Sequence, residues 1–252
     1  MPIVVAALFG LLVGSFLNVC IYRLPRDQSI VWPASRCTTC GRSLAWFENI
    51  PVLSYACLRG RCRTCREPIS PMYPLIEAAT AVIFVAGYAT VGWTPLLPIR
   101  LAFCCAMVVL FVVDLQYQIL PNEITLPGIV AGLLASAVAE PGFRDAALGA
   151  VAGGGVLWLV AWGYERVRHA EGMGFGDVKM LAMIGAFLGW KLMLLTLVGA
   201  SVVGSLVAGA LLLAGRARMQ SKLPFGSFLA LAAVPVSLVG DGVVSWYAGL
   251  YR

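Results

Sequence analysis

The sequence has few charged residues. Asp, Glu, Lys and Arg make up 12% of its 252 residues, whereas a soluble globular domain carries about 25%. Hydrophobic residues make up 60% of the chain. A protein dissolved in water needs more charged residues than this on its surface. The composition therefore excludes an ordinary soluble enzyme. It indicates a membrane protein that is surrounded by lipid.

Long apolar runs with almost no charge divide the chain. A membrane-spanning helix needs roughly 20 apolar residues, and backbone groups in lipid must bond within their own segment. The sequence therefore predicts an all-α, polytopic bundle of about eight transmembrane helices, at residues 3–22, 75–92, 97–114, 124–140, 146–163, 177–190, 192–214 and 226–248. Residues 177–190 are the shortest of these and could merge with the next. The first run lacks the basic start and cleavage site of a signal peptide, so it counts as a span.

The basic residues are distributed unevenly between the two sides of the predicted bundle. With the N-terminus outside, 14 Lys and Arg fall on the inner side and 4 on the outer side. The positive-inside rule therefore predicts that both termini lie outside. Arginine beside anionic lipid explains the net charge of +6, so the charge does not call for a nucleic-acid partner.

One long polar connection, residues 23–74, follows the first span. It contains two C-x-x-C pairs, Cys37 with Cys40 and Cys62 with Cys65, a spacing typical of a tetrahedral zinc site with four thiolates. Disulfides are the alternative, but the charge count puts this loop on the reducing side of the membrane. Four protein ligands leave no open position, so the predicted Zn²⁺ is structural. The other cysteines are interpreted as small buried hydrophobes: Cys20, Cys57, Cys104 and Cys105.

Four acidic residues lie in or against the predicted spans: Glu77, Asp114, Asp177 and Asp241. An ionisable residue at membrane depth is costly and is by default a candidate for function. Asp241 fits a solvated interface, and Glu77 fits a favourable position near a helix start. Asp114 ends one span and Asp177 begins another, both on the inner side of the predicted topology. These two carboxylates can therefore meet.

A pair of carboxylates a few ångströms apart shares a proton, and it can activate a water and protonate a leaving amine. The pair therefore predicts peptide hydrolysis. The stretch GMGFGDVK (172–179) places Gly174 and Gly176 directly before Asp177. Glycines let the backbone pass close to an extended peptide or to the other acidic helix. Each acid taken alone could instead be a helix cap or an ion pair, for instance Asp177 with Lys179.

Blocks along most of the chain resemble the type IV prepilin peptidases, the bifunctional leader peptidases and N-methyltransferases of bacterial pilus and type II secretion systems. The matching blocks are GSFLNVCIYRLP (14–25), NIPVLSY (49–55), LRGRCRTC (58–65), ISPMYPLIE (69–77), DLQYQILPNEITLP (114–127), GMGFGDVKMLAMIGAFLGW (172–190) and LPFGSFLA (223–230). The resemblance implies that Asp114 and Asp177 are the catalytic pair and that GFGD is the family's G-x-G-D motif. One departure is Asn122, where the family often has Asp.

The resemblance also implies a substrate and a second reaction. A prepilin or pseudopilin is cut after a glycine, between its basic leader and its hydrophobic helix, and the new N-terminal residue is methylated from S-adenosylmethionine. The enzyme is expected in the lipid bilayer of the bacterial inner membrane, with its active site facing the cytoplasm. Residues 1–22 are then the first transmembrane helix, residues 23–74 the zinc-binding loop associated with methyl transfer, and residues 75–252 the membrane peptidase core.

No motif locates the methyl donor, because no G-x-G-x-x-G fingerprint follows a strand in this sequence. Four loop residues are candidates by position alone: Glu48, Asn49, Tyr55 and Arg59.

Three other functions each fit part of the sequence. A peptidase without methyltransferase activity would keep the acidic pair, although the cysteine loop, which archaeal preflagellin relatives lack, favours the bifunctional form. A proton-coupled transporter would explain acids at membrane depth but not the cysteine pairs. A zinc-dependent membrane scaffold would leave the two aspartates unexplained.

Overall fold

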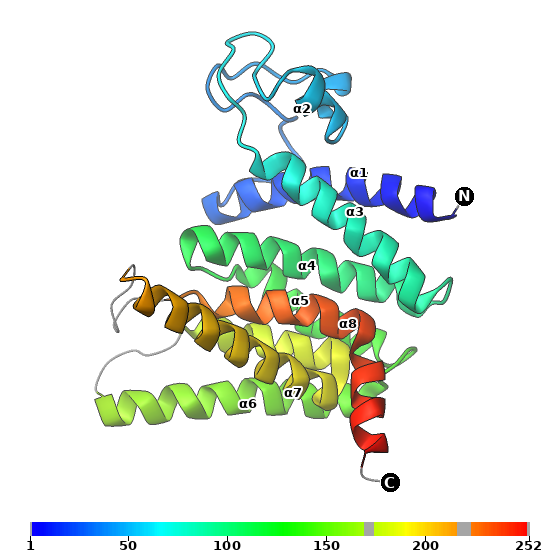
Figure 1. The fold of residues 1–252 in the computed structure, drawn as a ribbon, viewed down its shortest axis with the longest axis vertical. Helices are drawn as coiled ribbons and strands as arrows, with labels where there is room; N and C mark the ends of the chain where they lie inside the picture. The colour runs from blue at the N-terminus through cyan, green and yellow to red at the C-terminus, as the bar shows by residue number, and fades with distance from the viewer. Residues whose placement is uncertain (1, 169–173, 216–222, 251–252) are drawn as a thin grey trace. The chain divides into compact units, whose positions relative to one another are not determined.

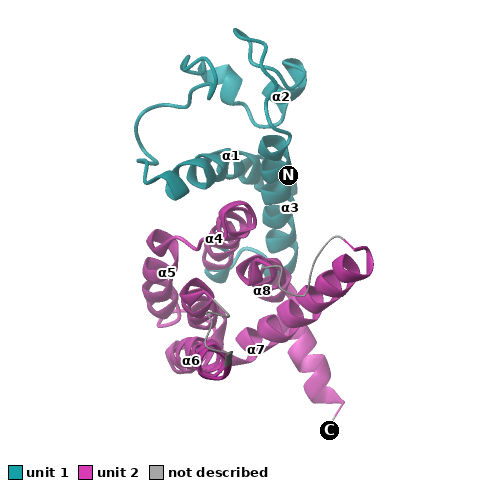
Figure 2. Cartoon of the chain, turned by 90° about the vertical axis from the view of Figure 1, so that its left-hand side faces the viewer, with its two compact units in different colours: residues 1–97 teal, residues 98–252 magenta. Residues whose placement is uncertain are grey.

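The computed structural model describes residues 2–168, 174–215 and 223–250 (Figure 1). Over these ranges the chain forms helices joined by turns and has no β-strand, only two isolated bridges in the cysteine loop. The predicted all-α class is therefore confirmed. The chain divides into two compact units, residues 1–97 and residues 98–252 (Figure 2).

Unit 1 is built on two long helices, α1 (Pro2–Arg23) and α3 (Met72–Val91). Two glycines of α1 bring their backbones together. A methyl group on Gly10 would lie 2.7 Å from the Cα of Ala81, and one on Gly14 would lie 2.7 Å from the Cα of Glu77. Small residues permit such close helix packing in lipid. The loop between α1 and α3 forms two short 3₁₀ turns and one short helix: η1 (Leu24–Arg26), η2 (Trp46–Asn49) and α2 (Leu53–Cys57).

Unit 2 contains the other five helices: α4 (Leu96–Tyr117), α5 (Asn122–Ala135), α6 (Phe143–Arg168), α7 (Phe175–Leu213) and α8 (Phe225–Gly249). Helix α7 lies at the centre and packs against α5, α6 and α8. Its inward side chains, such as Met180, Leu181 and Ile184, are fully buried. On α6, by contrast, large apolar side chains such as Val151, Leu159 and Val160 are exposed. This is what a helix facing lipid requires.

Helix α7 reverses its direction at Gly189. This glycine has φ +75° and ψ 172°, which breaks the helical run into two arms. The first arm begins at Asp177 beside Gly226, at the start of α8. The second arm starts with Leu192 beside Gly240, far along α8, and returns to place Gly204 beside Phe228. The two arms therefore run in opposite directions.

The eight predicted membrane segments all correspond to helices once the arms of α7 are separated. Within the described residues, six helices are long and apolar enough to cross a membrane, and α5 is a shorter apolar helix. Helix α7 has 39 residues, about 58 Å at 1.5 Å per residue, which is nearly twice the hydrocarbon thickness. The division of α7 into two arms at Gly189 accounts for this excess length. Two predicted ends were wrong by five residues: α5 ends at Ala135, where the chain turns, and α6 continues to Arg168.

A buried cation joins α4 to α8. The guanidinium of Arg100 donates to the carbonyl oxygen of Ser237 and, at 3.0 Å, to Oδ2 of Asp241. The Asp241 carboxylate is itself largely exposed. The solvated position expected for this acid is therefore correct, and its ion pair with Arg100 was not predicted.

We expect Gly189→Ala to lower the melting temperature of the detergent-solubilised protein. A side chain at φ +75° is strained by about 1–2 kcal/mol, and the added methyl would lie 3.0 Å from the Cβ of Pro141. Gly209→Ala is the matched control in the second arm, since its methyl meets nothing within 4 Å. Thermal unfolding of both variants checks this. Equal melting temperatures for the two would contradict the reversal at Gly189.

Candidate active site and metal centre

The two predicted acids lie on different helices of unit 2. Asp114 is near the end of α4 and is 5% exposed, and Asp177 is in the first turn of α7 and is 8% exposed. Neither carboxylate has an ion pair among the residues that the structure describes. Two nearly buried acids without a cation are energetically costly, so a purely structural role does not account for them.

The start of α8 brings these two acids together. A methyl group on Gly226 would lie 3.0 Å from Oδ2 of Asp114 and 3.0 Å from Oδ1 of Asp177. Because the same methyl position lies 3.0 Å from each oxygen, the two carboxylate oxygens are at most about 6 Å apart. The absence of a side chain at Gly226 leaves the space in which the carboxylates face each other.

Ser227 holds Asp114 in this position. Its backbone N–H and its hydroxyl both donate to Oδ2 of Asp114, at 2.6 Å and 2.8 Å. The amide of Gly226 faces Asp177. These amides are free to do so because the first N–H groups of a helix have no partner within it. No role was predicted for Gly226 or Ser227, although both lie in the block LPFGSFLA.

The glycine motif leads into α7. Gly174 immediately precedes the helix, and its carbonyl oxygen accepts from the amide of Asp177 at 3.1 Å. A methyl on Gly176 would lie 3.0 Å from the Cβ of Leu120, so the α7 backbone passes close to the segment that follows α4. Residues 172 and 173, at the start of the stretch GMGFGDVK, lie outside the described residues.

Lys179 does not pair with Asp177. Its ammonium group donates to Oδ1 of Asn122 and lies 5.4 Å from the ring centre of Phe175. The ion-pair alternative for Asp177 is therefore wrong. Asn122, the position that departs from the resembled family, is the partner of this lysine instead.

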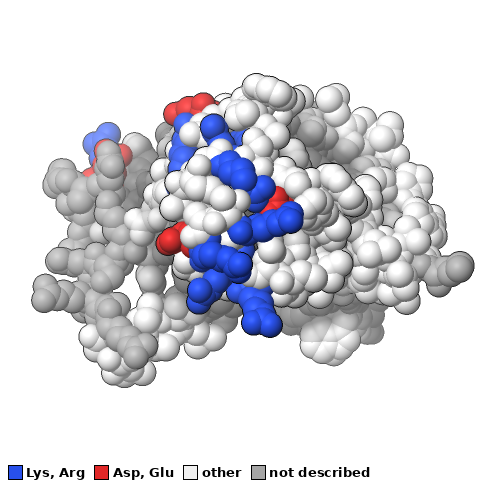
Figure 3. All heavy atoms as spheres, turned by 90° about the horizontal axis from the view of Figure 1, so that it is seen from above, with Lys and Arg blue, Asp and Glu red and all other residues white. Residues whose placement is uncertain are grey.

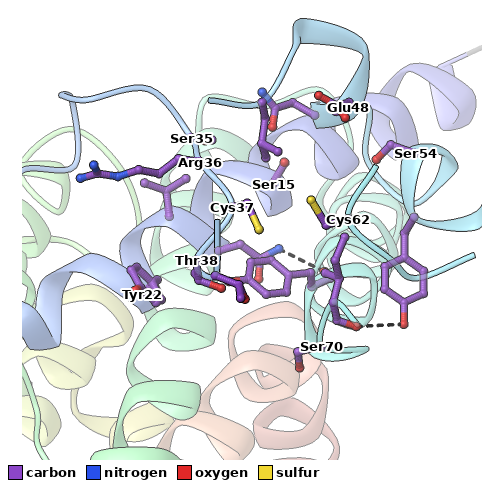
Figure 4. Close-up of a pocket in the computed structure, with 18 of the residues that line it drawn as sticks. Ser15, Tyr22, Ser35, Arg36, Cys37, Thr38, Glu48, Ser54, Cys62 and Ser70 are labelled. Carbon is purple, nitrogen blue, oxygen red and sulfur yellow. Dashed lines mark hydrogen bonds between the residues drawn. The ribbon is translucent and has the colours of Figure 1, made fainter. Parts of the chain in front are cut away.

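The four paired cysteines of unit 1 form one cluster. The sulfur atoms of Cys37, Cys40, Cys62 and Cys65 all lie within 4.8 Å of one another, and those of Cys37 and Cys65 are 3.8 Å apart. Metal–sulfur bonds of about 2.3 Å in a tetrahedron put the sulfurs about 3.8 Å apart. The cluster therefore fits a four-coordinate metal. Figure 4 shows the sulfurs of Cys37 and Cys62 approaching from the two halves of the loop.

The two C-x-x-C segments repeat one backbone arrangement. Cys37 and Cys62 each accept at the carbonyl oxygen from the amide four residues on, at 3.0 Å, and each donates to the carbonyl five residues on, at 2.9 Å. The amides of Cys65 and Thr64 lower the pKa of the Cys62 thiol to about 6. The same arrangement lowers the pKa of Cys37. The first cysteine of each pair thus favours thiolate, the form that binds metal.

All eight cysteines lie among the described residues, and none of them forms a disulfide. Cys20 and Cys104 are buried as expected, and Cys105 is half-buried. The interpretation of Cys57 as a buried hydrophobe was wrong. It is exposed at the end of the short helix α2, on a polar loop that has no apolar core to cover it.

The loop candidates for a methyl-donor site lie in different surroundings. The Arg42 guanidinium forms an ion pair with the buried Glu48 carboxylate at 2.7 Å and lowers the pKa of Glu48. This ion pair joins two positions of the loop and stabilises it. Asn49 and Tyr55, like Glu48, line a cavity of about 930 Å³ in unit 1, whereas Arg59 does not. The hydroxyl of Tyr55 donates to the carbonyl oxygen of Ile69 at 3.3 Å.

Basic side chains gather on the surface that Figure 3 presents. In the loop of unit 1 the exposed arginines are Arg26, Arg36, Arg59, Arg61, Arg63 and Arg66. Four of them adjoin the cysteines of the cluster in the sequence, namely Arg36, Arg61, Arg63 and Arg66. Four thiolates and a divalent metal would carry a net charge of about −2. The arginines therefore offset the charge of such a centre.

Fold and site together define a polytopic membrane protein with a close pair of buried aspartates and a separate four-cysteine centre. Comparison with known proteins agrees. Residues 8–91 match the bacterial Peptidase A24 N-terminal domain, and residues 101–209 match the type IV leader peptidase family. The chain belongs to this family, and the resemblance seen in the sequence is confirmed. It is a multi-pass protein of the inner membrane.

Several curated relatives carry the name prepilin leader peptidase/N-methyltransferase. The protein from Aeromonas hydrophila is 38% identical over 269 residues, covering 95% of this chain and 91% of the relative. The one from Pseudomonas putida is 39% identical over 265 residues, covering 96% and 92%. The one from Myxococcus xanthus is 47% identical over 210 residues, covering 82% and 63%. No solved structure gives a significant match.

Protein purified without chelators is expected to contain about one metal ion per chain. Cys62→Ser should reduce this to background and loosen the loop, because a structural metal contributes folding free energy. Cys57→Ser is the matched control, since this exposed thiol lies between the two pairs and outside the cluster. Elemental analysis measures the metal content of the wild-type protein and of both variants. Wild-type protein without metal, or equal metal in both variants, would contradict the four-cysteine centre.

Proposed function

We propose that this protein is an intramembrane aspartic endopeptidase that also methylates its product. It removes the basic leader of a prepilin or pseudopilin after a glycine, and it then methylates the new N-terminal residue with S-adenosylmethionine. The observation that carries the peptidase proposal is the pair of nearly buried carboxylates, whose oxygens are at most about 6 Å apart at Gly226. The names of the relatives support both activities.

The pair supplies both proton transfers that hydrolysis needs. Oδ2 of Asp114 is occupied by Ser227, while no hydrogen bond from a described residue reaches Oδ1. A water between Asp114 and Asp177 loses a proton to one carboxylate and attacks the carbonyl carbon after the leader glycine. The other carboxyl group donates a proton to the departing nitrogen as the C–N bond breaks. Two close carboxylates that share one proton are suited to this chemistry.

The active site faces the cytoplasm in this proposal, and both termini lie outside. The uneven distribution of Lys and Arg supports this orientation. A cytoplasmic loop lies in a reducing compartment, which agrees with free thiols. The metal of the four-cysteine centre is then Zn²⁺, held by Cys37, Cys40, Cys62 and Cys65. It supplies the cross-link that a loop of about fifty residues needs in place of a hydrophobic core.

Methyl transfer belongs, in this proposal, to residues 23–74 together with the flanking helices α1 and α3 of unit 1, and peptide hydrolysis to the part of the predicted core 75–252 that forms unit 2. The cavity in unit 1 supports this division because its volume of about 930 Å³ suits a nucleoside-sized ligand. Tyr22, Trp32 and Tyr55 line it and could accommodate an adenine ring or a sulfonium cation. Its residues therefore fit the proposed donor, which supplies an electrophilic methyl group when bound.

Asp114→Asn and Asp177→Asn should each lower prepilin cleavage by about 10³-fold or more, because the pair needs both carboxylates. Groups that act as one unit are not additive, so the double variant should be no worse than either single variant. Asp145→Asn is the control, since Asp145 lies beside Gly189 at the other end of the first α7 arm. Cleavage is measured in purified membranes. A single aspartate variant with near-wild-type cleavage would rule out the pair.

Ser227→Ala should lower the cleavage rate about tenfold without unfolding the protein. It removes one hydrogen bond to Asp114, worth about 0.5–1.5 kcal/mol, and keeps the backbone N–H bond to the same oxygen. Ser245→Ala is the control on the same helix, where the exposed hydroxyl bonds to the carbonyl of Asp241. Rates and melting temperatures are measured for both. An unchanged rate for Ser227→Ala would mean that this serine does not position Asp114.

A further inference from the structure

The cavity of unit 1 contains an acid that the peptidase reaction does not use. Glu77 lines this cavity and is only 8% exposed. It lies in the second turn of α3, where the contact between its Cα and Gly14 of α1 fixes the backbone. No described basic side chain forms an ion pair with it. The favourable helix-start position expected from the sequence therefore does not account for its burial.

A strained residue supplies one of the bonds that Glu77 makes, and the side chain of Ser15 supplies another. The backbone N–H of Val52 donates to Oε2 of Glu77 at 2.7 Å. Val52 has φ +60° and ψ −46°, a conformation that a β-branched residue seldom adopts and that costs about 1–3 kcal/mol. The loop thus bears strain to place one amide on this carboxylate. Strain that positions a partner for a cavity-lining residue such as Glu77 is a reason to look for a function there.

A second hydrogen-bond acceptor lines the same cavity. The amide of Asn18 is buried and donates to the carbonyl oxygen of Tyr73 at 3.1 Å. Its own oxygen has no partner among the described residues. Nearby Arg23 cannot serve either group, because it donates to the carbonyl oxygens of Ser29 and Pro33 at 2.8 Å and 2.7 Å. Two nearly buried acceptors without a cation suit a ligand that carries N–H donors and positive charge.

We propose that Glu77 and Asn18 bind the α-ammonium group of the cleaved pilin, and that Glu77 takes its proton before methylation. This inference rests on the proposed methyltransferase function. Within the cavity, the Glu77 carboxylate accepts one proton from the ammonium. The lone pair of the resulting amine forms the N–C bond to the methyl carbon as the C–S bond breaks and its electron pair stays on sulfur. Glu77 then passes the proton to water.

Glu77→Gln tests the proton transfer without removing the loop contact. The glutamine oxygen can still accept from the amide of Val52, but it cannot take a proton from an ammonium. Leader removal, metal content and binding of S-adenosylhomocysteine should stay within about threefold of wild type. N-methylation, measured by mass spectrometry of the processed pilin, should fall about 100-fold or more, as expected for loss of a general base. Methylation within threefold of wild type would overturn the proposal.

Glu67→Gln is the matched control, because Glu67 lines the same cavity but is exposed. It should methylate normally. If Glu77→Gln lost metal or S-adenosylhomocysteine binding together with methylation, Glu77 would be a structural residue and the proposed proton transfer would be wrong. Asn18→Ala should raise the pilin concentration that gives half-maximal methylation and leave leader removal unchanged. An unchanged pilin concentration would exclude Asn18 from the ammonium site.

Hydrogen exchange on the wild-type protein tests the cavity independently of any variant. S-adenosylhomocysteine should slow exchange in residues 28–38 and 49–55, which contribute to the cavity wall, and leave α6 unchanged. Binding without protection in these segments would overturn the placement of the site. Wild-type protein that cleaves prepilin but neither binds the analogue nor methylates its product would instead refute the methyltransferase function itself.

Discussion

The arrangement of the active site in unit 2 depends on the first turn of α8. Its amides and the hydroxyl of Ser227 hold Asp114, and the missing side chain of Gly226 leaves room for Asp177. Burying two carboxylates near each other is unfavourable, so the bonds at this helix start must offset part of the cost. The reversal at Gly189 serves the same geometry, because only a folded-back α7 lets the second arm return toward the start of α8.

Unit 1 depends on a different kind of constraint. Its loop is too short and too polar to bury a core, yet it encloses a cavity of about 930 Å³. Two interactions hold this loop in place. The cysteine cluster ties the two repeated segments together, and the bond from Val52 to Glu77 fastens the loop to α3. In this account the loop is ordered by a metal and by one buried carboxylate rather than by apolar packing.

Much of this could be predicted from the sequence because it depends on local composition and spacing. Apolar runs predict the helices, and the C-x-x-C pairs predict the cluster of Cys37, Cys40, Cys62 and Cys65. The meeting of Asp114 and Asp177 followed from topology. The roles of Gly226 and Ser227 could not be predicted, because they depend on a contact between residues 113 positions apart. The same holds for the ion pair of Arg100 and for the bond from Val52 to Glu77, which no periodicity encodes.

The central claim is that Asp114 and Asp177 act together on one peptide bond beside Gly226. The most direct measurement is an experimental structure of the protein with a prepilin peptide whose scissile bond is replaced by a non-cleavable hydroxyethylene group. We expect this hydroxyl to lie between the two carboxylates, within hydrogen-bonding distance of both, with the start of α8 alongside. A peptide bound away from Gly226, or carboxylates separated by clearly more than about 6 Å in that complex, would contradict it.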